Sequence, residues 1–298
     1  MGLAMKVSDF TMCERKVREA AATGTLVDLR VGDSDIHSPE KGTKWGPERT
    51  VRAEVIVDLL IGGGDTASMA VRGVGVQGAR ITGDLNLAAT PLRCPLALLD
   101  CSFACAINLK EATAMSLRLR GSHIPAVHAR QLRTRGDLQL DEGFSVSHGI
   151  DLAGAHIGGQ LSNPDGPALS ADRLSVDGGM FCREGFEATG EVRLLRAHIG
   201  GQLVCTGGQF SNPDGPAITA DGLTVDGSMF CDKGFEASLP AVLLHPRPPA
   251  SGRQSPRTRC LDRARCRAGV ECGLHHHGLD PRHRRRPESH WPSEARLT

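Results

Sequence analysis

One long segment occurs twice in this chain with few changes. Residues 162–188, SNPDGPALSADRLSVDGGMFCREGFEA, align without gaps to residues 211–237, with 20 identities in 27 positions. The substitutions preserve apolar character and change charge, as the pair Arg173 and Gly222 illustrates. Such internal repetition is typical of an architecture in which one structural unit is used several times.

The repeat has a short period. A phrase that begins with GG or GS and continues with QL or MF starts at Gly158, Gly178, Gly200 and Gly227, in steps of 20, 22 and 27 along the sequence. The longest step contains VCTGGQF, a stretch that the preceding copy lacks, which predicts a loop or an added partial strand. Short alternating stretches such as DLNL, LRL and IDL, separated by Gly, Asp, Asn and Pro, indicate strands of a few residues with one buried face.

A rung of about 20 to 22 residues, built from short strands and tight turns, predicts a mostly β fold. The class we predict is a single-stranded, right-handed parallel β-helix, in which alternate side chains fill a central column. A narrow column also explains why aromatic residues make up only 3% of the chain. A sandwich or barrel is the alternative, but it would not require near-identical sequence at a fixed step.

Residues 1–72 predict a small helical cap. Thr11 and Glu14 fit a capping box, and the helix that they start is expected to stop before Gly24. A second helix is predicted over residues 50–61, TVRAEVIVDLLI, with Gly62 as its stop. Its apolar face would hold Val51, Val55, Ile56, Leu59 and Leu60. We expect the polar segment between the two helices to form a surface loop, with the Trp45 side chain packed against the rest of the protein.

Residues 73–240 hold the repeat, and residues 241–298 break its pattern. From residue 245 to 298 the chain has 12 Arg, no Lys and 5 acidic residues, a net charge of +7, which leaves 23 basic and 29 acidic residues, a net charge of −6, in the rest. We expect the tail to be disordered, because its apolar surface is too small to offset the entropy lost on ordering.

Three interpretations of the tail remain open. Clustered Arg could contact nucleic-acid phosphates. The tail also contains residue types that bind metals, namely Cys260, Cys266, Cys272 and His275. Their spacing lacks the Cys-x2-Cys pair of common zinc sites, so we predict no metal. Translation of a shifted frame in a GC-rich gene would also give this mixture, and would mean that the natural repeat continues past Ala237. The nucleotide sequence around codon 240 would test this.

Bulk properties restrict the compartment and the partners. No apolar run has the length of an export signal, and none approaches about 18 residues, so we expect a cytoplasmic protein with no transmembrane span. Its ten cysteines are then expected to be free thiols. The mildly acidic body predicts no specific nucleic-acid binding.

One literal cofactor motif occurs. GVGVQG, with Gly73, Gly75 and Gly78, spells the dinucleotide-binding pattern G-x-G-x-x-G. That fingerprint requires a helix after it, whereas ARITGDLNL follows and alternates as a strand. We therefore interpret the three glycines as a turn that enters the first rung, and we predict no cofactor.

The hexapeptide HIGGQL begins at His156 and again at His198, which predicts two equivalent histidines two rungs, or about 10 Å, apart. This separation is too large for one metal ion. No carboxylate recurs beside them in a triad-like arrangement, so we interpret both as solvated turn histidines. Cys182 and Cys231 also occupy equivalent positions, which predicts small apolar residues stacked in the column rather than a thiol site.

Repeated aspartates offer a further candidate site. Asp177 and Asp226 lie in VDG, and Asp165 and Asp214 lie in NPDG, so a carboxylate ladder for calcium is conceivable. NPDG is a strong turn sequence by itself, because Pro fixes φ and Gly accepts positive φ. We favour turns, assign no metal site, and identify no catalytic residue.

The phrases GARITGDLNL, GAHIGGQL, VDGGMFC and WGPERTVRAEV resemble a family of uncharacterised actinobacterial repeat proteins, which are similar to pentapeptide-repeat β-helices but less regular. The resemblance covers roughly residues 10–240. Members often carry the label "oxidoreductase" or "membrane-associated oxidoreductase", and fuller members continue toward a hydrophobic C-terminal segment. The resemblance implies no catalytic motif that transfers to this chain.

Two functions follow as hypotheses. The first is a non-catalytic repeat scaffold that presents an elongated face to a protein or cell-envelope partner. The alternative is the oxidoreductase that the label implies, associated with a membrane at its periphery. A flavin or nicotinamide detected by absorbance and mass spectrometry would contradict the scaffold. An open final rung also predicts self-association, which size-exclusion chromatography would test.

Overall fold

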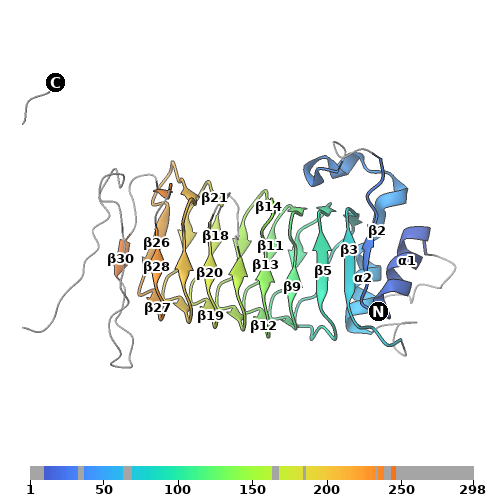
Figure 1. Cartoon of the computed structure of the whole chain (residues 1–298), viewed down its shortest axis with the longest axis horizontal. Coiled ribbons are helices and arrows are strands. Elements are labelled where there is room, and N and C mark those ends of the chain that lie inside the picture. The colour runs from blue at the N-terminus through green and yellow to red at the C-terminus, as the bar shows by residue number, and fades with distance from the viewer. Residues whose placement is uncertain are drawn as a thin grey trace, which may run out of the picture.

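The computed structural model describes residues 10–32, 37–62, 69–162, 168–183, 186–231 and 234–237, and the backbone of 243–245. This part of the chain forms an elongated parallel β-solenoid with helices at its N-terminal end (Figure 1). The predicted class, a parallel β-helix with a small helical cap, is therefore confirmed. The described helices are α1 (Met12–Ala21), η3 (Pro39–Lys44), η4 (Pro47–Arg49) and α2 (Ala53–Ile61).

The strands stack into parallel sheets that run along the solenoid. Sheet A consists of β1 (Leu26–Asp28), β3 (Val74–Gln77), β5 (Leu96–Leu99), β9 (Leu117–Arg118), β13 (Leu138–Gln139), β17 (Leu161–Ser162), β20 (Met180–Phe181), β24 (Leu203–Val204) and β28 (Met229–Phe230). Sheet B consists of β2 (Thr50–Arg52), β4 (Arg80–Thr82), β6 (Ser102–Phe103), β10 (His123–Ile124) and β14 (Ser145–Val146).

Sheet C consists of β7 (Ile107–Asn108), β11 (Val127–His128), β15 (Ile150–Asp151), β18 (Leu169–Ser170), β22 (Val192–Arg193), β26 (Ile218–Asp221) and β30 (Leu243–His245). Sheet D consists of β8 (Thr113–Ala114), β12 (Arg133–Thr134), β16 (His156–Ile157), β19 (Ser175–Val176), β23 (His198–Ile199) and β27 (Thr224–Val225). Sheet E consists of β21 (Glu187–Ala188), β25 (Gln209–Phe210) and β29 (Glu236–Ala237).

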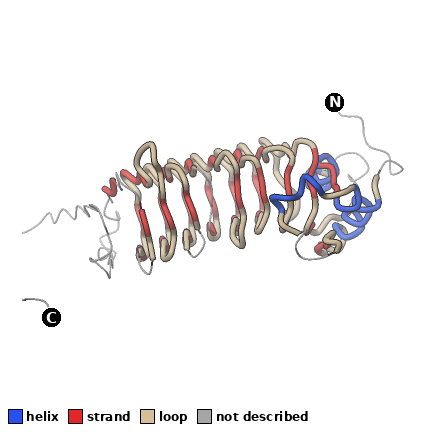
Figure 2. Tube along the Cα trace, turned by 90° about the horizontal axis from the view of Figure 1, so that it is seen from above, coloured by secondary structure: helices blue, strands red, loops and turns tan. Residues whose placement is uncertain are grey.

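The rungs from β5 to β16 pass through sheets A, B, C and D in that order, as β9 to β12 illustrate. In the rungs that begin with β20 and β24, sheet E takes the place of sheet B. Seen from above, the strands of successive rungs lie in rows (Figure 2). The stretch VCTGGQF contributes to β24 and β25, so the predicted partial strand is confirmed and belongs to sheet E.

The rung lengths differ from the steps between the sequence phrases. Equivalent inward positions in sheet A are Leu96, Leu117, Leu138, Leu161, Met180, Leu203 and Met229. The steps between these numbers are 21, 21, 23, 19, 23 and 26. The longest step has its extra residues between β25 and β26, because β25 pairs in register with β21 and occupies a corner that the preceding rung also has.

The phrase alignment was wrong by one residue at Gly178, and again at Gly227, where the strands pair Leu203 with Met229. It equated Leu161 with Phe181, whereas the strands pair Leu161 with Met180. Met180 is fully buried, and Phe181 lies on the outer side of sheet A. Strand alternation decides this register, because a slip of one residue would turn the inward side chain outward.

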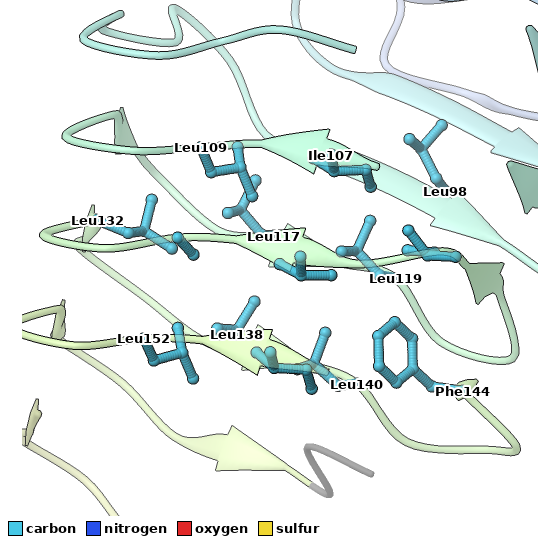
Figure 3. Packing of buried hydrophobic residues seen from close by; sticks show 14 of the residues in the cluster. Leu98, Ile107, Leu109, Leu117, Leu119, Leu132, Leu138, Leu140, Phe144 and Leu152 are labelled. Atoms are coloured by element: carbon cyan, nitrogen blue, oxygen red, sulfur yellow. The ribbon is translucent and has the colours of Figure 1, made fainter. Parts of the chain in front are cut away.

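The interior is a column of aliphatic side chains. Leu117 and Leu138 come from adjacent rungs and are at most 2% exposed, and Leu119 and Leu140 are at most 1% exposed. Figure 3 shows these leucines stacked from rung to rung, with Phe144 beside them. The fully buried apolar side chains supply most of the stabilisation, at about 1.5–3 kcal/mol each.

The corner between sheets D and A is tight enough to require glycine. Gly159, Gly178, Gly201 and Gly227 occupy equivalent positions there, as the cross-rung hydrogen bonds align them. A Cβ on any of the four would lie within 2.8 Å of the backbone of the preceding rung. The second glycine of HIGGQL is therefore retained in both copies by steric need, and the hexapeptide marks a rung corner.

The helical cap is built as the sequence predicts, with two differences. The segment predicted as a surface loop contains strand β1, which pairs with β3, and the short helices η3 and η4. Thr11 and Glu14 form the capping box of α1, and Gly62 ends α2 with φ of 77°. Trp45 is buried as expected. The second helix begins at Ala53 rather than at residue 50, because Thr50–Arg52 pairs in parallel with β4 and extends sheet B.

Glu14 joins this cap to the solenoid. Its carboxylate is 1% exposed and accepts hydrogen bonds from the Thr11 amide at 2.9 Å and from the Arg52 guanidinium at 2.7 Å. Burial opposes ionisation, but the hydrogen bonds from Arg52 and from backbone amides outweigh it and lower the pKa of the Glu14 carboxyl.

Glu14→Gln is expected to lower the free energy of unfolding by about 2 kcal/mol at neutral pH, because the charge-assisted hydrogen bonds are lost. A lowered folded-state pKa stabilises the fold fully above the unfolded value of about 4.3. This stabilisation is lost as the pH falls through the folded-state pKa. The difference in the free energy of unfolding between wild type and variant should therefore disappear at that pH. Urea unfolding at several pH values measures this gap. Glu19→Gln, at an exposed position of α1, is the control, and a pH-independent gap would contradict the role of Glu14.

The C-terminal end of the solenoid has open edges within the described residues. β27, β28 and β29 each end their sheet in the strand order, while β30 pairs with β26 and carries sheet C to His245. The side chains of Met229 and Phe235 are only partly buried there. Apart from the backbone of β30, the predicted tail lies outside the described residues.

Candidate functional site

The glycines of the G-x-G-x-x-G pattern lie along strand β3. Gly73 precedes the strand, Gly75 lies within it and Gly78 follows it with φ of +70°. Strand β4, rather than a helix, comes next. A Cβ at Gly75 would come within 3.2 Å of Leu26, so this glycine permits the close approach of β1. The arrangement does not place a helix N-terminus where a pyrophosphate would need it.

The outer side of sheet D holds the candidate site, which we call the D face. Its central column consists of the outward side chains of sheet D, namely Thr113, Arg133, His156, Ser175, His198 and Thr224. The column two residues later in each rung follows the strands, and consists of Met115, Arg135, Gly158, Asp177, Gly200 and Asp226. The column two residues earlier consists of Glu111, Gln131, Gly154, Arg173, Arg196 and Gly222.

Strand alternation creates this face. The residues between the outward positions, such as Leu174, Val176 and Ile199, point inward and are at most 1% exposed. Parallel pairing then brings together side chains that are far apart in sequence, since successive rungs lie about 4.8 Å apart. His156 and His198 lie on either side of Ser175, so their predicted separation by two rungs is confirmed.

Each histidine contacts an aspartate of the following rung. The His156 Nε2 atom lies 3.3 Å from Asp177 Oδ2, and the His198 Nε2 atom lies 2.9 Å from Asp226 Oδ2. The expectation that no carboxylate recurs beside these histidines in a triad-like arrangement missed these two His–Asp contacts. The sequence did contain evidence for these contacts in the repeated VDG. Its Asp occupies, in its own rung, the position that Gly158 occupies in HIGGQL. Both pairs are roughly half exposed, which makes them weak electrostatically.

Ser175 lies in register between the two histidines, which suggests a nucleophile and a base. Neither imidazole is joined to the Ser175 hydroxyl by a hydrogen bond in the described part of the chain. Nucleophilic catalysis requires that bond, and it also requires donors for the developing oxyanion.

Four arginines of the D face make no ion pair and no side-chain hydrogen bond within the described chain. They are Arg133, Arg135, Arg173 and Arg196, and all four are exposed. Arginines on the neighbouring sheet C differ, because Arg130 pairs with Asp151 and Arg193 pairs with Asp172. The D face carries these four arginines against Glu111, Asp177 and Asp226, a net charge of +1, whereas residues 1–244 as a whole carry a net charge of −6.

A column of cysteines fills the interior behind sheet A. Cys182, Cys205 and Cys231 lie in successive rungs, and the first two are at most 4% exposed. This confirms the stacking predicted for Cys182 and Cys231, and adds Cys205, which lies in the inserted VCTGGQF. A hydrogen bond with the Cys182 thiol, partly offset by one with Cys231, raises the pKa of the Cys205 thiol, and burial adds to this.

The Cys205 thiol is a packing group rather than a reactive one, because its raised pKa keeps it protonated and a protonated thiol is a poor nucleophile. All seven cysteines in the described segments are free, as expected: Cys13, Cys94, Cys101, Cys105, Cys182, Cys205 and Cys231. The candidate zinc ligands of the tail lie outside those segments.

The carboxylate ladder does not assemble where the chain is described. Residues 212–215, NPDG, form a turn in which the Asp214 amide donates to the Asn212 side chain at 3.2 Å, and the first copy with Asp165 falls outside the described residues. Within the described ranges, no group of three or more His, Cys, Asp or Glu side chains is arranged to hold a metal ion.

Comparison of the chain with protein-family models, with curated proteins and with solved structures gave no match. Among the helices that the structure describes, none has the length and apolar character needed to cross a bilayer. The D face therefore has to be interpreted from its own chemistry.

Proposed function

We propose that this protein is a non-catalytic repeat scaffold that presents its D face to an anionic protein or cell-envelope partner. The observation that carries the proposal is the set of four exposed arginines without a partner among the described residues, all on one face of a rigid solenoid. Arginine suits such a face, because its planar fork binds carboxylates and phosphates through two parallel hydrogen bonds.

The solenoid supports this function mechanically. Its rungs hold side chains from distant parts of the sequence at a fixed spacing, so a binding face needs little reorganisation when a partner arrives. The two His–Asp pairs lie between the arginines and add donors and acceptors along the same surface. Membership of the actinobacterial repeat family that the sequence resembles is part of this proposal, and the parallel solenoid supports it.

Self-association through the C-terminal end is also part of the proposal. Open β-edges readily pair with another chain, and the edges of β27, β28 and β29 are open among the described residues. Association of two chains at that end would leave the D face of each chain exposed. It would also lengthen the binding surface that the D face forms.

Removal of the four D-face arginines is expected to weaken binding of heparin, a sulfated polysaccharide, by about tenfold or more. Each exposed ion pair contributes about 0.2–1 kcal/mol, and four of them act together. The measurement is isothermal titration calorimetry at low salt with wild type and with a quadruple alanine variant at residues 133, 135, 173 and 196.

The control removes four cations elsewhere: Lys16, Arg72, Arg80 and Arg118 become alanine. Its overall charge change is identical, so equal loss of binding in the two variants would attribute the affinity to net charge and contradict a role for the D face. Absence of heparin binding by the wild type would contradict the proposal outright. Circular dichroism checks that both variants keep the wild-type fold.

A further inference from the structure

A hollow of about 660 Å³ lies along the corner where sheet C passes into sheet D. Small residues, Ala153 and Gly154, line it in one rung, and neighbouring rungs contribute Arg130 on one side and Arg173 on the other. This volume lies within the range of about 300–1,000 Å³ typical of sites for small ligands. The hollow includes the D-face residues Arg173 and Arg196 and extends beyond the D face to side chains such as Arg130 and Asp172.

The backbone at this corner is left-handed in successive rungs, whichever residue occupies it. Cross-rung hydrogen bonds align Gly154, Arg173, Arg196 and Gly222 in one column. The two arginines have φ of 58° and 54°, and Gln131 of the same column also has φ of 58°. Glycine adopts this conformation without steric cost, as it does at Gly154 and Gly222. The corner therefore accepts glycine in place of either arginine.

The charges of the hollow nearly balance. Arg130, Arg173 and Arg196 are opposed by Asp172 and Asp221, so the lining carries one excess positive charge. Asp172 also pairs with Arg193 at 2.8 Å, and Arg130 pairs with Asp151 at 3.1 Å. The side chains of Arg173 and Arg196 make no ion pair or side-chain hydrogen bond within the described residues, and they come from adjacent rungs.

We infer that the hollow binds an acidic sugar unit of a polysaccharide, with its carboxylate held between Arg173 and Arg196. Adjacent rungs are about 4.8 Å apart, so two guanidinium groups can reach one carboxylate. The ring hydroxyls then meet Gln131, Asp172 and Asp221, whose amide and carboxylate groups donate to and accept from hydroxyls. This inference rests on the scaffold proposed above and names the chemical class of its partner.

The lining favours a carboxylated sugar over other anions. One excess positive charge matches a single carboxylate, whereas a phosphate group with nearly two negative charges would be repelled by the two aspartates. A peptide would need apolar pockets for its side chains, and the lining offers only Ala153 and Leu195 as apolar residues.

Trigalacturonate is the probe, and binding to the full chain is measured by isothermal titration calorimetry. Arg173→Gly with Arg196→Gly is the test variant, because glycine suits the left-handed corner and the fold should be retained. We expect its affinity to fall by about tenfold or more, since two charge-assisted contacts are lost. Ala153→Phe, which fills the hollow and leaves every charge in place, should weaken binding to a similar extent.

The matched control, Arg72→Ala with Arg118→Ala, removes the same charge from sheet A and should leave the affinity within about twofold of wild type. Arg133→Ala with Arg135→Ala should weaken heparin binding but not trigalacturonate binding. If this variant weakens both ligands as much as the glycine variant does, the hollow has no special role, although the scaffold proposal stands.

Three further results would overturn the inference: no trigalacturonate binding by the wild type, equal affinity for neutral maltotriose, or tighter binding of tripolyphosphate. Heparin binding that persists in any of these cases would leave the scaffold proposal intact. Loss of the fold in the glycine variant, seen by circular dichroism, would leave Ala153→Phe as the deciding variant.

Discussion

Leu117→Ala is expected to lower the free energy of unfolding by about 2–5 kcal/mol. Leu117 is fully buried and lies in register between Leu96 and Leu138, which are each 2% exposed. The truncation removes buried methyl groups and leaves a cavity. Because the backbones of the flanking rungs are fixed by hydrogen bonds on both sides, they can close this cavity only in part.

Urea unfolding followed by circular dichroism measures the change. Arg118→Ala is the control, because Arg118 is the next residue of the same strand, points outward and makes no ion pair among the described residues. Its effect should be within about 0.5 kcal/mol of zero. A loss below about 1 kcal/mol for Leu117→Ala would contradict a close-packed column.

Leu117→Ala should also reveal how cooperative the solenoid is. Each rung contacts only its neighbours, so stability is close to a sum of rung and interface contributions. Hydrogen exchange should therefore rise most in the rungs beside residue 117 and least near β24 and β28. Uniform loss of protection along the whole solenoid would mean that it unfolds as a single unit.

Gly201→Ala is expected to lower the free energy of unfolding by about 1–3 kcal/mol or more. A Cβ at this position would lie 2.8 Å from the Gly178 carbonyl carbon and 2.9 Å from the Gly179 nitrogen. These are backbone atoms of the preceding rung, where the Gly178 carbonyl also accepts a hydrogen bond from the Gly201 amide at 2.8 Å. The methyl group can be accommodated only if the two rungs separate.

Gly73→Ala is the control for this substitution. A Cβ there would meet nothing closer than 3.6 Å, and its φ is not in the left-handed region. Thermal unfolding should give a midpoint near that of wild type for Gly73→Ala and a clearly lower midpoint for Gly201→Ala. Equal midpoints would show that the corner can relax, and would remove steric need as the reason for the repeated glycine.

The fold class could be predicted because its signals are local. The capping box of Thr11 and Glu14, the helix stop at Gly62 and the inward alternation around Leu117 each depend on a few neighbouring residues. The long repeated segment then reveals that one unit recurs, which restricts the fold to a stacked array. Cys182 and Cys231 were placed correctly because their two copies are nearly identical.

The register between rungs could not be predicted in the same way. The step from Leu161 to Met180 is 19 and the step from Leu203 to Met229 is 26, so similar phrases do not mark equivalent positions. The start of α2 was misplaced for a related reason. The segment 50–52 has helical periodicity, but pairing with β4 satisfies its backbone in a strand.

The candidate site depended almost wholly on that register. Residues 1–244 together carry a net charge of −6. That sum does not indicate that the protein binds an anionic partner. Only the stacking of rungs gathers Arg133, Arg173 and Arg196 on one side of the solenoid and sets Asp177 beside His156. A sum over the sequence contains no information about which residues share a face.

Strand alternation, turn glycines and helix caps act over a few residues, so the sequence alone indicates a parallel solenoid with a capped N-terminal end. Which side chains meet across rungs depends on the three-dimensional register of the strands. Those contacts join side chains that lie a whole rung apart in the sequence, and a change of one residue in rung length moves every later side chain to a different neighbour.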